Sequence, residues 1–175
     1  MGASLVLGGA RSGKSRYAQR MAEGASAAVG RKPVYIATGE PGDAEMAERI
    51  STHQAERADR WINLETPLDL AGALNSLAPD DIAVVDCLTL WLSNSMLAED
   101  DNHGARLDAL PVAISACPAR LWLVSNEVGW GVVPDNALAR RFRDEAGRLH
   151  QRVAEMAQEV VLVVAGLPLV LKPAP

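Results

Sequence analysis

The most constraining feature of this sequence is a glycine-rich octapeptide near its amino end. Residues 8–15 read Gly-Gly-Ala-Arg-Ser-Gly-Lys-Ser and match the pattern G-x-x-x-x-G-K-[ST]. A short apolar run over 4–7 precedes the octapeptide, and a helical pattern over 15–28 follows it. In that setting glycines let successive backbone N–H groups point at phosphate oxygens, and the helix N-terminus adds positive potential. The octapeptide therefore predicts a phosphate-binding loop, or P-loop.

The side chains of this loop suggest a nucleoside triphosphate bound with Mg²⁺. Lys14 is expected to reach the β- and γ-phosphates, and Ser15 to place its hydroxyl on the metal. Asp86 ends a second apolar run, Ile82–Val85, and is the expected second metal ligand, although a strand-ending aspartate can also simply close a turn. The expected nucleotide-binding residues of the loop are Gly8, Gly9, Ala10, Arg11, Ser12, Gly13, Lys14 and Ser15.

Composition narrows the class of protein further. The net charge is −5, which weighs against a broad nucleic-acid surface, so a phosphate must be held by a local device such as the P-loop. With 175 residues we expect one domain over 1–175. Cys87 and Cys117 are far apart and are expected to be reduced core thiols, with no structural zinc site. The longest uncharged run, 160–171, is too short to cross a bilayer, so we expect a soluble, cytoplasmic protein.

Apolar runs alternate with helical patterns, which predicts an α/β fold with a mainly parallel sheet. We expect strands over 4–7, 33–38, 61–65, 82–86, 121–125, 160–165 and, at an edge, 167–171. We expect helices over 15–28, 43–58, 88–97, 106–116 and 136–158, and another opening at Thr66–Pro67 with the threonine as its N-cap. A polar stretch over 98–104 is the expected disordered loop, and 126–135 an ordered surface loop.

The sequence also separates classes of P-loop protein. A GTPase switch would continue Asp-x-x-Gly after its second strand, but Asp86 is followed by Cys-Leu-Thr, and Asn-Lys-x-Asp is absent. The Leu-Ser-Gly-Gly signature of transporter ATPases is absent too. The length suits a small-molecule kinase or a nucleotidyltransferase.

Four stretches resemble the bifunctional adenosylcobinamide kinase / adenosylcobinamide-phosphate guanylyltransferase family of cobalamin biosynthesis. They are 8–15; Tyr35–Thr38 with Glu45, Met46, Arg49, Ile50, His53, Arg57 and Trp61; Val85–Asn94; and Ser125–Gly129 with Gly131–Pro134, Leu138–Arg140 and Phe142–Asp144. The resemblance runs essentially from end to end. It implies a RecA-like P-loop NTPase sandwich with a central, mainly parallel sheet flanked by helices. It also implies a homo-oligomer, with a trimer as one form.

The resemblance implies two reactions. A nucleoside triphosphate, ATP or GTP, phosphorylates adenosylcobinamide, and GTP then transfers GMP to adenosylcobinamide phosphate and releases pyrophosphate. In the family this transfer passes through a guanylylated histidine, and His53 is the matching position; a neutral imidazole is a competent nucleophile near pH 7. Further nucleotide contacts carried over from the family are Ala37, Thr38, Gly39, Gln54, Ala55, Glu56, Arg57 and Glu65.

Several assignments stay open at this point. Glu65 could be a surface acid, and Asp86 and Glu127 are both candidates for the general base of the kinase step. His103 is expected to be solvated, and His150 to be packed or on the surface; the family often has asparagine at that position. Trp91, Leu92, Met96 and Trp130 are expected either in a subunit interface or in the core.

Two other functions fit the P-loop without the resemblance. One is a small-molecule kinase that transfers no nucleotide. The other is a nucleotide-dependent regulatory switch, which the missing switch motifs disfavour.

Overall fold

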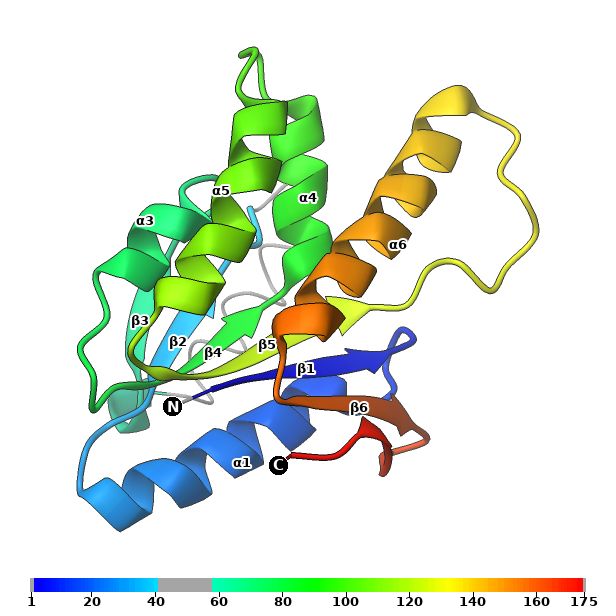
Figure 1. The fold of residues 1–175 in the computed structure, drawn as a ribbon. Coiled ribbons are helices and arrows are strands. Elements are labelled where there is room, and N and C mark those ends of the chain that lie inside the picture. Colours follow the sequence, from blue (N-terminus) through cyan, green and yellow to red (C-terminus); the bar gives the residue numbers. More distant parts are fainter. Residues whose placement is uncertain (1, 41–57, 175) are drawn as a thin grey trace.

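A computed structural model describes residues 2–40 and 58–174 (Figure 1). The strands are β1 (Ala3–Gly8), β2 (Val34–Ala37), β3 (Ile62–Glu65), β4 (Ile82–Asp86), β5 (Arg120–Asn126), β6 (Glu159–Val164) and β7 (Leu167–Lys172). The helices are α1 (Lys14–Val29), α3 (Leu70–Asn75), α4 (Leu88–Leu97), α5 (His103–Ala116) and α6 (Ala137–Met156), with a 3₁₀ turn at Ala58–Arg60. The helix predicted over 43–58 falls on residues outside the described part, apart from its last residue.

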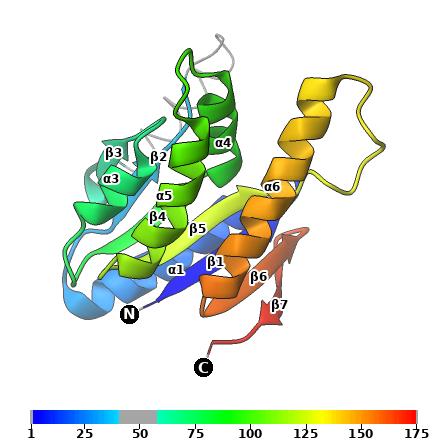
Figure 2. The same ribbon diagram turned by 45° about the horizontal axis from the view of Figure 1, so that its top comes forward.

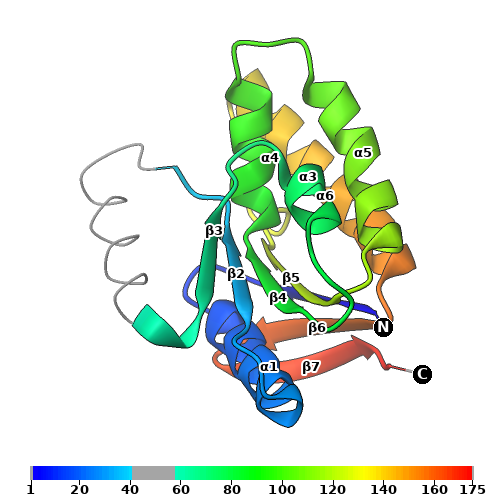
Figure 3. The ribbon, with the colours of Figure 1, turned by 90° about the vertical axis from the view of Figure 1, so that its left-hand side faces the viewer.

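All seven strands form one sheet in the order β3-β2-β4-β5-β1-β6-β7. Every neighbouring pair is parallel except β6 and β7, which are antiparallel. Helix α1 covers one face of the sheet, and α3, α4, α5 and α6 cover the other (Figures 2 and 3). The predicted α/β sandwich with a mainly parallel sheet is confirmed.

Strand alternation divides the apolar side chains between the two faces of the sheet. Val6, Val84 and Val124 pack toward the small residues Ala18 and Ala22 of α1. The larger cluster on the opposite face contains Leu5, Leu123 and Leu149, all nearly or fully buried. Burial of one such side chain contributes about 1.5–3 kcal/mol. This opposite cluster also holds Trp91 and Leu92, at 1% and 0% exposure, so these two residues belong to the core and not to a subunit interface.

Helix α3 begins later than predicted. The expected start at Thr66–Pro67 is wrong: the helix begins at Leu70, and the Asp69 side chain caps it by accepting a hydrogen bond from the Gly72 N–H at 2.9 Å. The Thr66 N–H instead donates to the Ala37 carbonyl at 2.8 Å, which continues the pairing of β3 with β2. Because this bond keeps the chain extended, the helix cannot begin there.

The polar loop after α4 is shorter and more ordered than predicted. Helix α5 begins at His103, so only 98–102 connect the two helices. The Arg106 guanidinium donates two hydrogen bonds to the Asp100 carboxylate, which lower the pKa of Asp100 to about 2. The expectation that His103 is solvated is also wrong. Its Nδ1 lies 3.0 Å from the Ser95 hydroxyl and its Nε2 lies 2.6 Å from Oε2 of Glu145, so it joins α4, α5 and α6.

Within residues 2–40 and 58–174, no helix has both the length and the apolar character needed to cross a membrane. In the same part of the chain both cysteines are free, and no three His, Cys, Asp or Glu side chains gather into a potential metal cluster.

Candidate nucleotide-binding site

The P-loop lies where the sequence predicts it, between β1 and α1 at the carboxyl edge of the parallel strands (Figure 1). Arg11 and Gly13 have φ angles of 55° and 93°, and the Ser12 N–H donates to the Gly9 carbonyl at 3.2 Å. The loop is held from outside as well. The Gly166 N–H donates to the Ser12 carbonyl at 2.8 Å, so the turn between β6 and β7 fixes the far side of the loop.

Two glycines of the loop are required by space or by backbone conformation. A Cβ on Gly8 would clash with the Ser12 hydroxyl and lie 2.6 Å from the carbonyl oxygen of Val163. A Cβ on Gly13 would lie 3.3 Å from the Gly166 Cα, and its positive φ disfavours any other residue. The glycines therefore let the loop pack tightly against the end of β6.

Two side chains of the loop fit a phosphate ligand. The Lys14 ammonium donates to the Gly9 carbonyl at 3.2 Å and folds back over the loop. Burial lowers the pKa of Lys14, and the nearby Asp86 opposes this effect. The Ser12 hydroxyl is buried and has no hydrogen-bond partner among the described residues. A buried hydroxyl without a partner is costly, and an oxyanion oxygen would satisfy it.

Asp86 ends β4, two strands away from β1 in the sheet. Its Oδ2 accepts a hydrogen bond from the Tyr35 hydroxyl at 2.8 Å, and Tyr35 is buried in β2. A carboxylate and a serine hydroxyl offer the hard oxygen ligands that Mg²⁺ prefers, so Asp86 and Ser15 fit the metal predicted for them.

A polar network ties together the carboxyl ends of the central strands. The Thr38 hydroxyl accepts from the Cys87 N–H at 2.8 Å and donates to the Cys87 carbonyl at 2.7 Å. Asn94 of α4 donates to the Thr38 carbonyl at 2.7 Å, and Asn126 at the end of β5 donates to the Thr89 hydroxyl at 3.1 Å. These bonds fix the ends of β2, β4 and β5 relative to one another.

No site role was predicted for Tyr35, Thr89, Asn94 or Asn126, although all four lie in the stretches that resemble the family. Two signals were available for them. Asn126 ends a buried strand and Thr89 lies three residues after one, and Tyr35 is a phenol within an apolar strand.

A second polar group lies beyond the end of β5. Glu127 donates its backbone N–H to the Gly8 carbonyl at 3.0 Å and accepts the Gly129 N–H on its side chain at 2.8 Å. Its Oε2 lies 3.8 Å from Nδ1 of His150, whose Nε2 lies 2.7 Å from the Ser125 hydroxyl. Burial lowers the pKa of His150, with Glu127 opposing this effect. Of the two positions expected for His150, the structure assigns the packed one.

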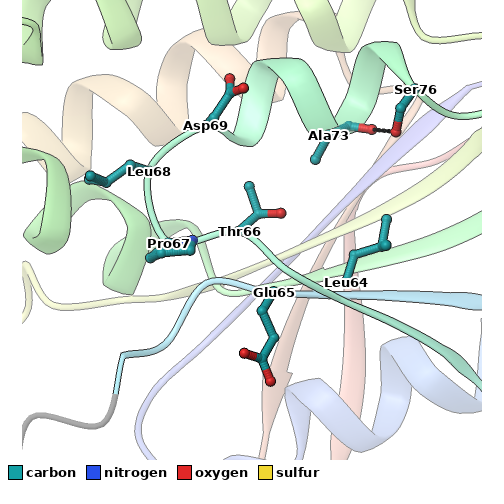
Figure 4. A pocket seen from close by; sticks show the side chains of 8 residues that line it. All are labelled: Leu64, Glu65, Thr66, Pro67, Leu68, Asp69, Ala73 and Ser76. Carbon is teal, nitrogen blue, oxygen red and sulfur yellow. Dashed lines mark hydrogen bonds between the residues drawn. The ribbon is translucent and has the colours of Figure 1, made fainter.

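Glu65 ends β3 at the same edge of the sheet, four strands from β1. It borders a pocket of about 400 Å³ formed by the connection from β3 to α3. Figure 4 shows the Glu65 side chain pointing to the opposite side of its strand from Leu64 and Thr66. Ala37 ends β2, and Thr38 and Gly39 follow it; β2 lies between the strands that end at Glu65 and Asp86.

The structure thus brings most of the predicted site residues to one edge of the sheet. They are the loop residues 8–15 together with Ala37, Thr38, Gly39, Glu65 and Asp86. The predicted nucleophile His53 and its neighbours Gln54, Ala55, Glu56 and Arg57 lie outside the described residues.

Comparison with solved structures gives distant similarities. A KaiC-like protein from Pyrococcus horikoshii aligns with 92% of this chain and 70% of its own, at 13% identity and a TM-score of 0.48. The P4 protein from bacteriophage phi6, in complex with ADP, aligns with 96% of this chain and 54% of its own, at 15% identity and a TM-score of 0.47.

Curated relatives are much more similar. The bifunctional adenosylcobalamin biosynthesis protein CobP from Pseudomonas aeruginosa is 50% identical, over 98% of this chain and 98% of its own. The bifunctional adenosylcobalamin biosynthesis protein CobU from Salmonella typhimurium is 42% identical, over 96% of this chain and 98% of its own. A family model described as cobinamide kinase / cobinamide phosphate guanyltransferase matches residues 4–171. With the P-loop in place and similarity along nearly its whole length, this chain belongs to the cobinamide kinase / cobinamide phosphate guanyltransferase family of bifunctional enzymes.

Proposed function

We propose that this enzyme phosphorylates adenosylcobinamide with ATP or GTP and then transfers GMP from GTP to adenosylcobinamide phosphate. The products are adenosylcobinamide-GDP and pyrophosphate, in the assembly of the nucleotide loop of cobalamin. The observation that carries the proposal is the match of the family model to residues 4–171, which include the complete P-loop.

The P-loop binds the triphosphate in both reactions. Backbone N–H groups of the loop and the buried Ser12 hydroxyl donate to phosphate oxygens. The Lys14 ammonium leaves the Gly9 carbonyl and reaches the β- and γ-phosphates, where its charge stabilises the negative charge of the leaving group. Ser15 and Asp86 hold Mg²⁺, which neutralises part of the phosphate charge when it is bound.

Guanylyl transfer uses His53 as the nucleophile. A neutral imidazole nitrogen attacks the α-phosphorus, an N–P bond forms, and the bond to the bridging oxygen breaks with its electron pair leaving on pyrophosphate. An oxygen of adenosylcobinamide phosphate then attacks the same phosphorus and releases His53. The resemblance of the stretch around His53 to the family supports this role.

The nucleoside end of GTP extends along the sheet edge from β1 toward β3. Adjacent strands are about 4.8 Å apart, so the four spacings between β1 and β3 span about 19 Å. An extended nucleoside triphosphate is comparable in length. We therefore assign the ribose and guanine to Ala37, Thr38, Gly39 and Glu65 at this end of the sheet edge. The resemblance to the family adds Gln54, Ala55, Glu56 and Arg57, which lie outside the described residues.

We also propose that the enzyme works as a homo-oligomer. Exposed apolar side chains support this proposal, among them Leu167 and Leu169 of the edge strand β7 and Trp130 of the loop after β5, at 73%, 57% and 76% exposure. Light scattering coupled to gel filtration measures the mass directly. A monomer at micromolar concentration would contradict this proposal.

The central experiment is intact-protein mass spectrometry after incubation with Mg-GTP. The wild type is expected to gain one GMP, in an acid-labile and base-stable adduct, while His53→Ala gains none and still binds GTP. Lys14→Ala is expected to lose both GTP binding and the GMP adduct. A wild type that phosphorylates the corrinoid without any adduct would be a simple kinase. Nucleotide-linked association without turnover would indicate a regulatory switch.

A further inference from the structure

We infer that Glu127 is the general base of the kinase step and that the buried His150 positions its carboxylate. This inference rests on the proposed function, because it names the residue that removes the proton from the acceptor hydroxyl. It begins from three linked side chains that the nucleotide site does not use: Ser125, His150 and Glu127.

The position of Glu127 follows from the strand order. β5 lies between the P-loop strand β1 and the Asp86 strand β4, and Glu127 is the first residue beyond β5. Its backbone N–H donates to the carbonyl of Gly8, the first residue of the P-loop, at 3.0 Å. The main chain of Glu127 is therefore fixed beside the loop that binds the phosphates.

The carboxylate of Glu127 is held in place, and no lysine or arginine among residues 2–40 and 58–174 pairs with it. Oε1 accepts the Gly129 N–H at 2.8 Å, and the side chain retains 19% exposure. The basic group beside it within the described part of the chain is Nδ1 of His150, 3.8 Å from Oε2. A carboxylate without a lysine or arginine partner is available to take a proton from an acceptor hydroxyl.

His150 is built to orient this carboxylate. The imidazole is buried at 7% exposure, and Nε2 lies 2.7 Å from the hydroxyl of Ser125, which is fully buried. Burial lowers the pKa of His150, so the ring is neutral at pH 7 and carries one N–H. With Ser125 donating to Nε2, the proton sits on Nδ1 and faces Glu127. The neutral N–H of His150 then faces the carboxylate across 3.8 Å, and in the proposed step it orients the carboxylate without protonating it.

The same geometry disfavours Asp86, the other candidate. Strand alternation places Asp86 with Val84 on the face covered by α1. Its Oδ2 already accepts the Tyr35 hydroxyl, and its charge acts on Lys14. Glu127 alternates with Leu123 and Ser125 toward α6, on the other face. Asp86 and Glu127 thus lie on opposite faces of the sheet. In this arrangement Asp86 serves as the metal ligand and Glu127 as the base.

In the proposed step the acceptor hydroxyl gives its proton to Glu127 as its oxygen forms a bond to the γ-phosphorus. The bond from that phosphorus to the bridging oxygen breaks, and the nucleoside diphosphate leaves with the electron pair. The product is the phosphate monoester, and Glu127 returns its proton to water.

The experiment compares corrinoid phosphorylation, GTP binding and GMP-adduct formation in four variants. Glu127→Gln is expected to lower kcat for phosphorylation about 100-fold or more, the usual contribution of a general base. Its GTP affinity and its GMP adduct should stay within about 3-fold of wild type. Glu99→Gln, at an exposed site after α4, is the matched control and keeps all three.

The role of His150 is tested by rescue. His150→Asn keeps a donor near Glu127 and is expected to retain kcat within about 3-fold. His150→Leu keeps the packing but removes the donor, and is expected to lower kcat about 10-fold with KM for the nucleotide unchanged. A merely structural histidine would give equal kcat per folded molecule in both variants, with only their stability reduced.

Three outcomes would overturn the inference. Glu127→Gln could phosphorylate the corrinoid at the wild-type rate. It could lose GTP binding and the GMP adduct together with phosphorylation, which would make Glu127 a support for the P-loop and not a base. A wild type that phosphorylates no cobinamide would overturn the proposed function itself, and the base with it.

Discussion

The Tyr35 hydroxyl lies 2.8 Å from Oδ2 of Asp86 and joins the carboxyl ends of the neighbouring strands β2 and β4. The phenol ring packs edge-on against Trp61 at 5.8 Å between ring centres, so it is positioned from the far side as well. Asp86 is therefore oriented by a neighbour before any metal or nucleotide binds.

Removal of this hydroxyl should weaken the metal site and leave the core intact. Tyr35→Phe keeps the ring against Trp61 but removes the donor to Asp86. We expect the Mg²⁺ concentration for half-maximal activity to rise about 5-fold, which corresponds to about 1 kcal/mol for one hydrogen bond. Tyr17→Phe, on α1, is the control. An unchanged Mg²⁺ dependence would contradict the assignment of Asp86 as a metal ligand.

Lys14 should reduce the stability of the protein without nucleotide. Burial lowers its pKa below the ordinary value of 10.5. A lysine that holds its proton less tightly when folded destabilises the protein at low pH, and this effect disappears as pH rises through the lowered pKa. We therefore expect Lys14→Met to raise the free energy of unfolding by about 1 kcal/mol at pH 7 while it abolishes triphosphate binding.

Denaturant unfolding across the pH range tests this prediction. The difference between wild type and Lys14→Met should shrink as pH rises toward 10.5. Lys32→Met, at an exposed position, should show no such trend. A Lys14→Met variant that is less stable at every pH would mean that Lys14 stabilises the empty loop.

Gly8 should tolerate no side chain. A Cβ there would lie 2.6 Å from the Val163 carbonyl, a backbone atom that cannot move without disturbing β6. We expect Gly8→Ala to lower the free energy of unfolding by about 1–3 kcal/mol, as overpacking usually does. Gly9→Ala has open space around its Cβ and should unfold like the wild type. Equal stability of the two variants would contradict the tight packing described for the loop.

The contacts of Glu145 with His103 and Arg141 should stabilise the helical layer in a pH-dependent way. Burial alone would raise the pKa of Glu145, but hydrogen bonds from Arg141 and His103 outweigh it and lower the pKa below 4.5. Its contribution is present above that value and is lost as pH falls through the lowered pKa.

We expect Glu145→Gln to destabilise the protein by about 2 kcal/mol at pH 7, as loss of a charged acceptor does. Its unfolding curve should converge with that of the wild type as pH falls below 4.5 and through the lowered pKa of Glu145. Glu155→Gln, exposed on the same helix, is the control. A difference that persists unchanged at low pH would mean that packing, and not charge, is responsible.

Much of this fold could be predicted because its signals, apolar runs and glycine patterns, lie within short stretches of the sequence. The apolar run and its flanks gave α4 as Leu88–Leu97, the range observed, and the glycine pattern placed the P-loop. The start of α3 was wrong because Thr66 pairs with Ala37, a residue far away along the chain. The prediction that His103 is solvated was wrong for the same reason, because its partner Glu145 also lies far away along the chain.

The candidate site was predictable to a similar extent. Lys14 followed from the P-loop motif, Asp86 from the end of its apolar strand, and Glu65 from the resemblance to the family. Parallel strands bring their carboxyl ends to one edge, which places these residues on the same side of the sheet. The Tyr35–Asp86 bond was not predictable because it depends on which strands are neighbours. The Ser125–His150–Glu127 group was not predictable because it depends on where α6 packs against the end of β5. Strand order is a property of the whole sheet, and single motifs do not encode it.

The hydrogen bond from Gly166 to Ser12 links the first functional segment of the chain to one of its last. Synthesis on the ribosome proceeds from the amino end, so the P-loop emerges long before the turn that supports it. A nascent chain that ends before Glu159 lacks both this bond and the β6 strand beside Gly8. Nucleotide binding should therefore arise only after β6 and the turn that follows it have left the ribosome.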